Sequence, residues 1–338
     1  MSKFTALLGI LLAPALWPQE LAGGPYTVHV GPRQGTIMWI VKDAAGLRAQ
    51  RVTLGNLAPN RRYDYDVMGR DAGKGSFKSA PETRASFTFA VFGDTRSRHE
   101  MHQRVVDALV QESPDFVVHT GDLVSDGREL EQWPRFFQIE KELLRRAAFF
   151  PVLGNHERNS PRFHEFFDIE SPYYSFAWGA AHFTLLNSDV GNAVKSAEER
   201  AAWWAEQVRW LEEDLAKARG ADFRFVVLHH PPMTAVKRRL GQNEHVHELI
   251  PLFERHRVHA VFAGHDHNYQ HHVKNGVRYI VTGGGGAPLY PVDAPDPELT
   301  RKVESVEHYV RIRVQGTRAR VEAIGLDGRQ IDAFELRP

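Results

Sequence analysis

Short apolar runs that end in polar residues recur five times along the chain. The runs are rich in Val, Phe and Leu and occupy residues 87–92, 116–120, 149–153, 223–228 and 259–262. Helical patterns lie between them, most clearly at residues 100–111 and 197–218, where apolar positions fall on one side. Strands that alternate with amphipathic helices predict a layered α/β structure with a largely parallel sheet. The polar residues after each run are then expected to meet at one edge of that sheet.

The first part of the chain has a different pattern. Short strands separated by turn residues are predicted at 26–30, 36–41, 48–54, 63–68 and 75–79. Leu57, Pro59 and Tyr63 have the spacing of a tyrosine corner, in which the tyrosine hydroxyl bonds back to the preceding turn. Together with Trp39, these features predict a small all-β sandwich of the fibronectin type III kind over residues 24–83, with both aromatic side chains in its core.

Residues 1–22 are predicted to be a secretory signal. Lys3 precedes an apolar run over residues 4–12, and Ala13-Pro14-Ala15 offers a small-residue cleavage site. The alternative is a packed or unstructured N-terminal tail. The run is shorter than the about 20 residues that a membrane span requires, so the sequence favours a secreted or periplasmic protein.

Composition limits the possible partners. The 338 residues contain 42 basic and 42 acidic side chains and no cysteine. A net charge of zero, without a long basic run, gives no electrostatic signature of nucleic-acid binding. The absence of cysteine excludes disulfides and thiolate metal ligands.

The polar residues that follow the apolar runs have the character of metal ligands. They comprise two carboxylates, one amide and three imidazoles: Asp94, Asp122, Asn155, His229, His265 and His267. This mixed oxygen and nitrogen set suits Mn, Zn or Fe better than Ca. Six ligands exceed what one tetrahedral zinc ion uses. Two metal ions about 3.5–4 Å apart, bridged by a carboxylate and a water, would use all six.

Five sequence blocks resemble those of the calcineurin-like metallophosphoesterases. They are Gly-Asp-Thr-Arg at 93–96, Gly-Asp-Leu-Val at 121–124, Gly-Asn-His-Glu at 154–157, Val-Leu-His-His-Pro-Pro at 227–232 and Gly-His-Asp-His at 264–267. The resemblance covers residues 86–338 and implies an α/β (α+β) four-layer sandwich. With the predicted β-sandwich in front, the chain is most similar to the purple acid phosphatase branch, which also carries a fibronectin-like N-terminal domain.

The resemblance also implies roles for individual residues. Asp94, Asp122 and His267 would hold the first metal, Asp122 would bridge, and Asn155, His229 and His265 would hold the second. His156 matches the family histidine that contacts phosphate and protonates the leaving oxygen. A hydroxide held between the two metals would attack phosphorus.

Two positions depart from the family pattern. Arg96 stands where many members have a ligating histidine, and Ser125 stands where purple acid phosphatases have the tyrosine that binds ferric iron. Neither side chain replaces the missing ligand, since arginine is not deprotonated in proteins. We therefore expect water, or alternatively Asp126, to complete the first metal site. We also expect no tyrosinate-to-iron absorption band and a catalytic, phosphate-binding role for Arg96.

Further histidines and a tyrosine are weaker candidates. His230 and Tyr269 are predicted to contact substrate. His245 and His247 follow a predicted loop at 238–243 and would reach the site from its rim, the alternative being a solvated start of a helix. His271 and His272 are expected at the surface.

The predicted function is therefore hydrolysis of a small phosphate ester, with a monoester favoured. One alternative is a phosphodiesterase acting on a nucleotide or a phospholipid-derived diester at the same site. A second is a binding protein in which the metals are only structural.

Overall fold

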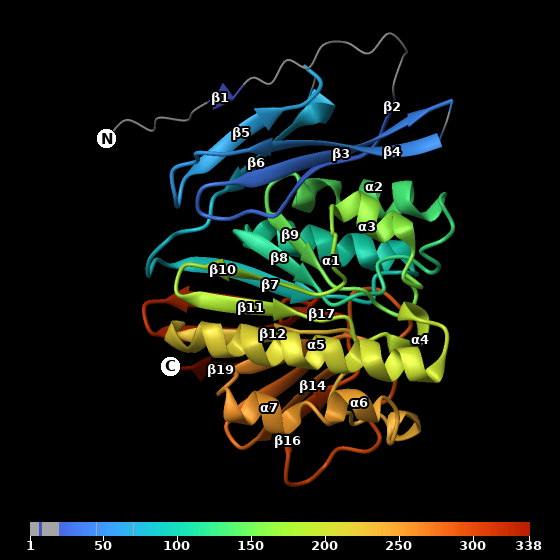
Figure 1. Cartoon of the computed structure of the whole chain (residues 1–338), viewed down its shortest axis with the longest axis vertical. Helices are drawn as coiled ribbons and strands as arrows, with labels where there is room; N and C mark the ends of the chain where they lie inside the picture. Colours follow the sequence, from blue (N-terminus) through green and yellow to red (C-terminus); the bar gives the residue numbers. More distant parts are fainter. Residues whose placement is uncertain (1–6, 9–19, 45, 70) are drawn as a thin grey trace.

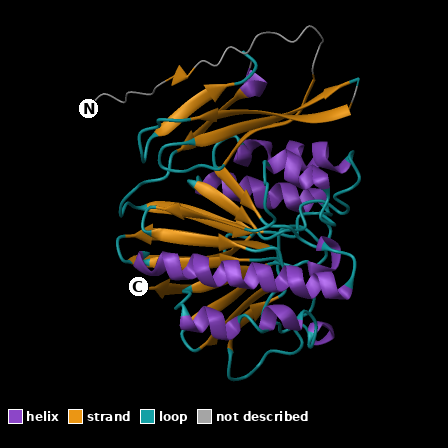
Figure 2. Cartoon of the chain, viewed as in Figure 1, coloured by secondary structure: helices purple, strands orange, loops and turns teal. Residues whose placement is uncertain are grey.

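Two large β-sheets pack face to face and carry helices on their outer faces (Figures 1 and 2). The computed structural model describes residues 7–8, 20–44, 46–69 and 71–338. The order of the layers is helices, sheet, sheet, helices, so the prediction of a four-layer α/β sandwich is confirmed.

The first large sheet has nine strands, of which β7, β8 and β9 run parallel at its centre. Its order is β19 (Gln330–Leu336), β18 (Arg318–Gly325), β17 (His308–Gln315), β7 (Phe87–Phe92), β8 (Phe116–His119), β9 (Ala148–Pro151), β2 (Glu20–Val28), β3 (Gly35–Asp43) and β4 (Gly46–Leu54).

The second large sheet has seven strands, and its central strands β11, β12, β13 and β15 are parallel. Its order is β10 (Tyr174–Trp178), β11 (Ala181–Leu185), β12 (Phe223–Val227), β13 (Ala260–Ala263), β15 (Val277–Thr282), β14 (Tyr269–Lys274) and β16 (Thr300–Glu304).

Phenylalanine side chains fill the space between the two sheets. Phe89 of β7 meets Phe183 of β11 edge to face, with ring centroids 5.1 Å apart, and Phe225 of β12 at 5.5 Å. All three rings are completely buried. Burying a side chain of this size contributes about 1.5–3 kcal/mol relative to leaving it exposed, so these contacts hold the two sheets, and the loops at their ends, in one arrangement.

Helices cover both outer faces. On the first sheet lie α1 (His99–Glu112), α2 (Gln132–Leu144) and α3 (Pro161–Phe167), and on the second lie α5 (Ala197–Lys217), α6 (Glu244–His247) and α7 (Ile250–Arg255). The short segments are α4 (Val190–Ala193) and the 3-10 turns η1 (Asp71–Gly73), η2 (Ala218–Gly220) and η3 (Lys237–Arg239). α5 begins with a capping box formed by Ser196 and Glu199. Within the described part of the chain, no helix is long and apolar enough to cross a membrane.

The N-terminal strands extend the first sheet. β2 pairs with β9 in parallel at Thr27 and Ala148, which adds β2, β3 and β4 to the strands of the central core. Ile37, Trp39 and Val41 of β3 pack against a third, small sheet formed by β5 (Arg62–Asp66), β6 (Lys74–Lys78) and β1 (Leu7–Leu8).

The predicted tyrosine corner is confirmed, because the backbone N–H of Ala58 donates to the Tyr63 hydroxyl at 2.7 Å. The fibronectin type III identity and the domain limits at 24–83 and 86–338 stay predictions. Most of the predicted signal segment, residues 1–22, lies outside the described residues.

Candidate metal centre

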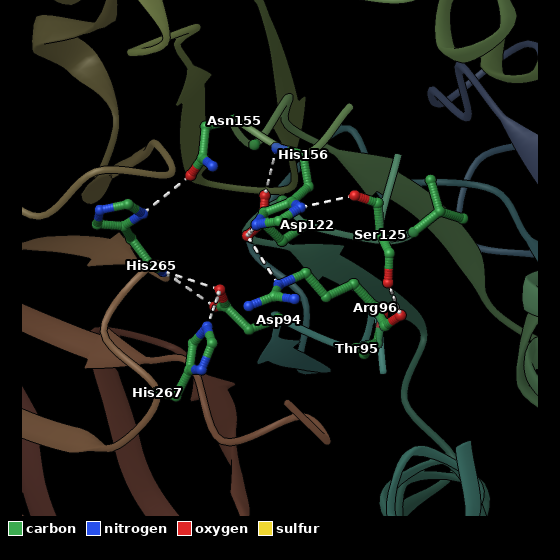
Figure 3. Close-up of polar contacts among 12 residues, drawn as sticks. Asp94, Thr95, Arg96, Asp122, Ser125, Asn155, His156, His265 and His267 are labelled. Atoms are coloured by element: carbon green, nitrogen blue, oxygen red, sulfur yellow. Dashed lines mark hydrogen bonds and ion pairs between the residues drawn. The ribbon is translucent and has the colours of Figure 1, made fainter. Parts of the chain in front are cut away.

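The six predicted metal ligands meet where the parallel strands of both sheets end. Asp94, Asp122 and Asn155 follow β7, β8 and β9 of the first sheet, and His265 and His267 follow β13 of the second sheet (Figure 3). His229 follows β12 of the second sheet. Facing sheets thus bring residues more than 170 positions apart together: the backbone N–H of His265 donates to Asp94 Oδ2 at 3.0 Å.

Backbone geometry at these turns is unusual. Asp94, Asp122 and His265 have φ angles of 60°, 59° and 67°, in the left-handed region. Such conformations cost of order 1–3 kcal/mol and persist only where the surroundings enforce them. The close approach of the loops is one such constraint, since a Cβ on Gly264 would lie 2.5 Å from Asp94 Oδ2.

One group of donors is formed by Asn155, His229 and His265. The Asn155 Oδ1 atom lies 3.1 Å from His229 Nε2 and 3.0 Å from His265 Nδ1, and the two nitrogens are 3.2 Å apart. His229 Nδ1 donates to the carbonyl of Thr120 at 2.8 Å, so its Nε2 presents a lone pair. Ligands about 2.1 Å from one metal ion and at right angles to each other are about 3 Å apart. The spacing of these three atoms therefore fits one bound cation, which would remove the repulsion between acceptor atoms that otherwise face one another.

A second group is formed by Asp94, Asp122 and His267, whose potential ligand atoms all lie within 4.8 Å of one another. His267 Nδ1 donates to the carbonyl of Pro288 at 2.7 Å, so Nε2 turns its lone pair toward Asp94 Oδ1, 3.4 Å away. Burial raises the pKa of Asp94, but the hydrogen bond and charge of a protonated His267, with the charges of His229 and Arg96, more than offset this and hold that pKa below its usual value. A metal ion would take the place of the ring proton between this carboxylate and Nε2, so the second group also fits a cation.

Asp122 stands between the two groups. Its Oδ1 is 3.5 Å from His229 Nε2 of the other group, as expected of a bridging ligand. The residues present thus fit two metal ions, divided as the family resemblance implies.

Glu157 supports this arrangement, and the sequence analysis assigned it no role. Its two carboxylate oxygens accept backbone N–H bonds from Asp122, Leu123 and Gly154 at 2.7–2.8 Å. Burial and the charge of Asp122 raise the pKa of Glu157 to about 8, and these N–H bonds oppose the rise. One carboxylate thereby ties the turn that carries Asp122 to the turn that carries Asn155. Its place as the last residue of the Gly-Asn-His-Glu block was the available signal.

His156 and Arg96 both lie beside Asp122 (Figure 3). His156 Nδ1 donates to the carbonyl of Ser125 at 2.7 Å, which leaves Nε2 on the side of Asp122 Oδ2, 3.9 Å away. Arg96 Nε is 3.5 Å from the same oxygen and has no hydrogen-bond partner among the described residues. The structure therefore places an imidazole and a guanidinium together at the bridging carboxylate.

Ser125 and Asp126 do not fill the place of the missing ligand. The Ser125 hydroxyl donates to the carbonyl of Arg96 at 2.6 Å. The Asp126 carboxylate accepts hydrogen bonds from Arg128 and Arg158, which hold its pKa well below the usual value. The alternative in which Asp126 completes the first metal site is therefore wrong, because two arginines bind this side chain outside the cluster.

Of the two predicted substrate contacts, His230 lies near the metal centre and Tyr269 does not. His230 lies beside the centre, with its ring centroid 4.3 Å from that of His265, and burial holds its pKa well below the usual value. Tyr269 is fully buried and donates its hydroxyl to Asp332 at 2.9 Å. Its prediction as a substrate contact is wrong, because the side chain points into the core between the sheets.

The histidines of α6 lie close to the site but are engaged with backbone. His245 Nε2 donates to the carbonyl of Ser188 at 3.0 Å, and His247 Nδ1 to that of Pro232 at 2.9 Å. His271 and His272 are both buried, contrary to expectation.

A two-sheet α/β fold with two groups of metal-binding side chains at the strand ends defines a protein of the metallophosphoesterase class. The model of the family described as calcineurin-like phosphoesterase matches residues 87–269. The chain belongs to this family.

Similar proteins include phosphatases and proteins without a described activity. The chain is 27% identical to an uncharacterized protein of Mycobacterium tuberculosis over 68% of its own length and 51% of that protein. It is 26% identical to acid phosphatase type 7 of Homo sapiens, with 90% of this chain and 81% of the other covered. A purple acid phosphatase from yellow lupin (Lupinus luteus) seeds has a similar fold, with a TM-score of 0.66 at 15% identity over 91% of this chain and 60% of the lupin chain. The chain thus spans about half the length of the first of these relatives.

Proposed function

We propose that the protein hydrolyses phosphate monoesters with the help of two metal ions. The observation that carries this proposal is the pair of donor clusters, Asp94, Asp122 and His267 on one side and His229, His230 and His265 on the other. Asp122 lies 3.5 Å from His229 of the second cluster, and His156 lies beside Asp122 and outside both clusters. Two metal ions bound there would supply an activated water for attack on phosphorus and positive charge for the phosphoryl oxygens.

His156 is the proposed general acid. Because its Nδ1 proton is committed to the carbonyl of Ser125, the second ring nitrogen is the one that carries a proton toward the site. An imidazole in this position can hold a proton on Nε2 and transfer it to the leaving oxygen as the ester bond breaks. A structural metal site would not need an imidazole in this position, which favours the enzyme over a non-catalytic binding protein.

Arg96 is the proposed phosphate contact and the reason to favour a monoester. Its guanidinium is largely buried, with 18% of the side chain exposed, and among the described residues its Nε has no hydrogen-bond partner and only the 3.5 Å contact to Asp122. A planar guanidinium can donate two parallel hydrogen bonds to phosphate oxygens. A monoester keeps more non-bridging oxygens and more negative charge than a diester, and so gains more from this contact. His230 is proposed to line the same site.

The first metal is proposed to lack a tyrosinate ligand. Ser125 occupies the relevant position and its hydroxyl is bonded to backbone, so we expect water as the additional ligand. A preparation loaded with iron is then expected to be colourless in the visible region where tyrosinate absorbs. We also propose a secreted or periplasmic location, which rests on the sequence of residues 1–22.

Metal-stripped protein reloaded with Mn²⁺, Zn²⁺ or Fe²⁺ would test the function on p-nitrophenyl phosphate and bis-p-nitrophenyl phosphate. We expect metal-dependent hydrolysis, faster with the monoester. Faster hydrolysis of the diester would support the phosphodiesterase alternative. No hydrolysis with any metal, despite two bound ions per chain, would refute the enzyme and support the binding protein.

A further inference from the structure

An open pocket of about 530 Å³ adjoins the metal centre next to His230. Its walls are the segment 188–191, which follows β11, and the segment 241–245, which leads into α6. His230 forms the side nearest the centre, because its ring lies 4.3 Å from that of the predicted ligand His265. A phosphoryl group at the metals would therefore lie beside this pocket, which has the size of a small-molecule site.

Specific hydrogen bonds hold the pocket together. Ser188 joins the two walls, since its carbonyl accepts from His245 Nε2 and its hydroxyl oxygen accepts from the backbone N–H of His230. Asn192 joins the pocket to the centre, because its Nδ2 donates to Asp189 Oδ2 at 2.7 Å and to the carbonyl of Asn155 at 3.4 Å. The pocket is thus connected by hydrogen bonds to the backbone of the predicted ligand Asn155.

The charge of the pocket is negative. Asp189 and Glu244 both line it, Asn243 adds an amide, and none of its described lining residues is a lysine or arginine. Burial lowers the pKa of His245, which is therefore neutral near pH 7. The neighbouring cation Arg239 directs its Nε toward Asp266 at 3.7 Å. A positively charged group would be favoured in this pocket, and a second anionic group would be repelled.

We propose that this pocket receives the alcohol portion of the ester and selects an amino alcohol, whose ammonium group meets Asp189 and Glu244. The inference rests on the proposed phosphatase function and names its substrate class. In the reaction, water adds to phosphorus, the bond to the alcohol oxygen breaks, and that oxygen gains a proton. The amino alcohol and inorganic phosphate leave as products.

Three small esters test this selectivity on the metal-loaded full chain. O-phosphoethanolamine carries an ammonium group, glycerol 2-phosphate is neutral in its alcohol part, and 2-phosphoglycolate carries a carboxylate. We expect kcat/KM to fall in this order, by about tenfold or more between the first and the last, as one buried carboxylate, Asp189, and one exposed carboxylate, Glu244, would produce.

Because these alcohols differ in intrinsic reactivity, variants provide the decisive comparison. Glu244→Gln is expected to reduce the ratio of kcat/KM for O-phosphoethanolamine to that for 2-phosphoglycolate by about three- to tenfold. Glu248→Gln is the matched control, since Glu248 is exposed one turn further along and does not line the pocket. It should leave the ratio as in the wild type.

An unchanged ratio in Glu244→Gln, or an equal change in both variants, would overturn the inference. So would a wild-type preference for 2-phosphoglycolate. Failure to hydrolyse p-nitrophenyl phosphate, which needs no ammonium, would instead refute the phosphatase function itself. The two failures are therefore distinguishable.

Discussion

Replacing Tyr290 should weaken the first metal site, because this residue holds the ring of His267. The two rings are stacked, with centroids 4.1 Å apart and an angle of 21° between their planes. The guanidinium carbon of Arg238 lies 4.0 Å from the same tyrosine centroid. Two groups that close to one ring cannot share a face, so Tyr290 is held between Arg238 and His267.

The size of the effect follows from these contacts. Ring stacking contributes about 0.5–1.5 kcal/mol, and loss of a group that orients a metal ligand costs about 10–100-fold in affinity. The hydrogen bond from His267 Nδ1 to Pro288 remains in Tyr290→Leu and still orients the imidazole. We therefore expect the lower limit, about tenfold weaker binding of one metal ion.

Metal content at controlled free-metal concentration, measured by mass spectrometry after equilibrium dialysis, would show this directly. The Leu variant should lose about half its metal at concentrations where the wild type stays saturated, because the second site does not contact Tyr290. Tyr290→Phe keeps the ring and should bind metal as the wild type does. Wild-type affinity in the Leu variant, or equal losses in both variants, would show that the stack has no part in metal binding.

Three further predictions concern catalysis and stability. His156→Ala should lower kcat by about 10²–10⁴-fold while both metals stay bound, and loss of metal from this variant would contradict its role as the general acid. Arg96→Leu should reduce kcat/KM for p-nitrophenyl phosphate by about 10–100-fold, which is the loss expected for a charge-assisted hydrogen bond. The reduction for bis-p-nitrophenyl phosphate should be smaller, and equal reductions for the two esters would contradict monoester selection by Arg96. Asp214 accepts hydrogen bonds from His182 and Thr184 at 2.7 and 2.6 Å; burial alone would raise its pKa, but these bonds lower it below the unfolded value. The stabilisation from these bonds is therefore present above about pH 4 and is lost as pH falls through the folded pKa. In urea unfolding at pH 7, Asp214→Asn should lower the free energy of unfolding by about 2 kcal/mol. This loss should be smaller at pH 3, and a loss that is independent of pH would contradict the reasoning.

The positions of the central strands and the metal-ligating residues that follow them could be predicted from the sequence, because both depend on residues that are neighbours in the chain. The apolar run at residues 87–92 coincides with β7, and Asp94 comes two residues after its end, so its delivery to the sheet edge needs no knowledge of distant contacts. The same reasoning holds for Asp122 after β8 and His265 after β13. Parallel strands end at a common edge, so their following residues meet.

Side-chain directions were decided by partners far away in the chain. Tyr269 turns into the core because Asp332, 63 residues later, accepts its hydroxyl. Asp126 is held outside the cluster by Arg128, two residues further on, and by the more distant Arg158. Neither Asp332 nor Arg158 is marked by a sequence pattern. The pairing of β2 with β9, which joins the N-terminal strands to the central sheet, is likewise a long-range contact.

The sequence by itself determined which residues can bind metal and on which strands they stand, because hydrophobic periodicity and motif spacing are local properties. Only the tertiary structure decided which side chains face the centre, that Glu157 ties its turns together, and that residues 188–191 and 241–245 enclose a negatively charged pocket beside it. The physical reason is that loop side chains settle by burial and hydrogen bonding with groups that the fold alone brings near.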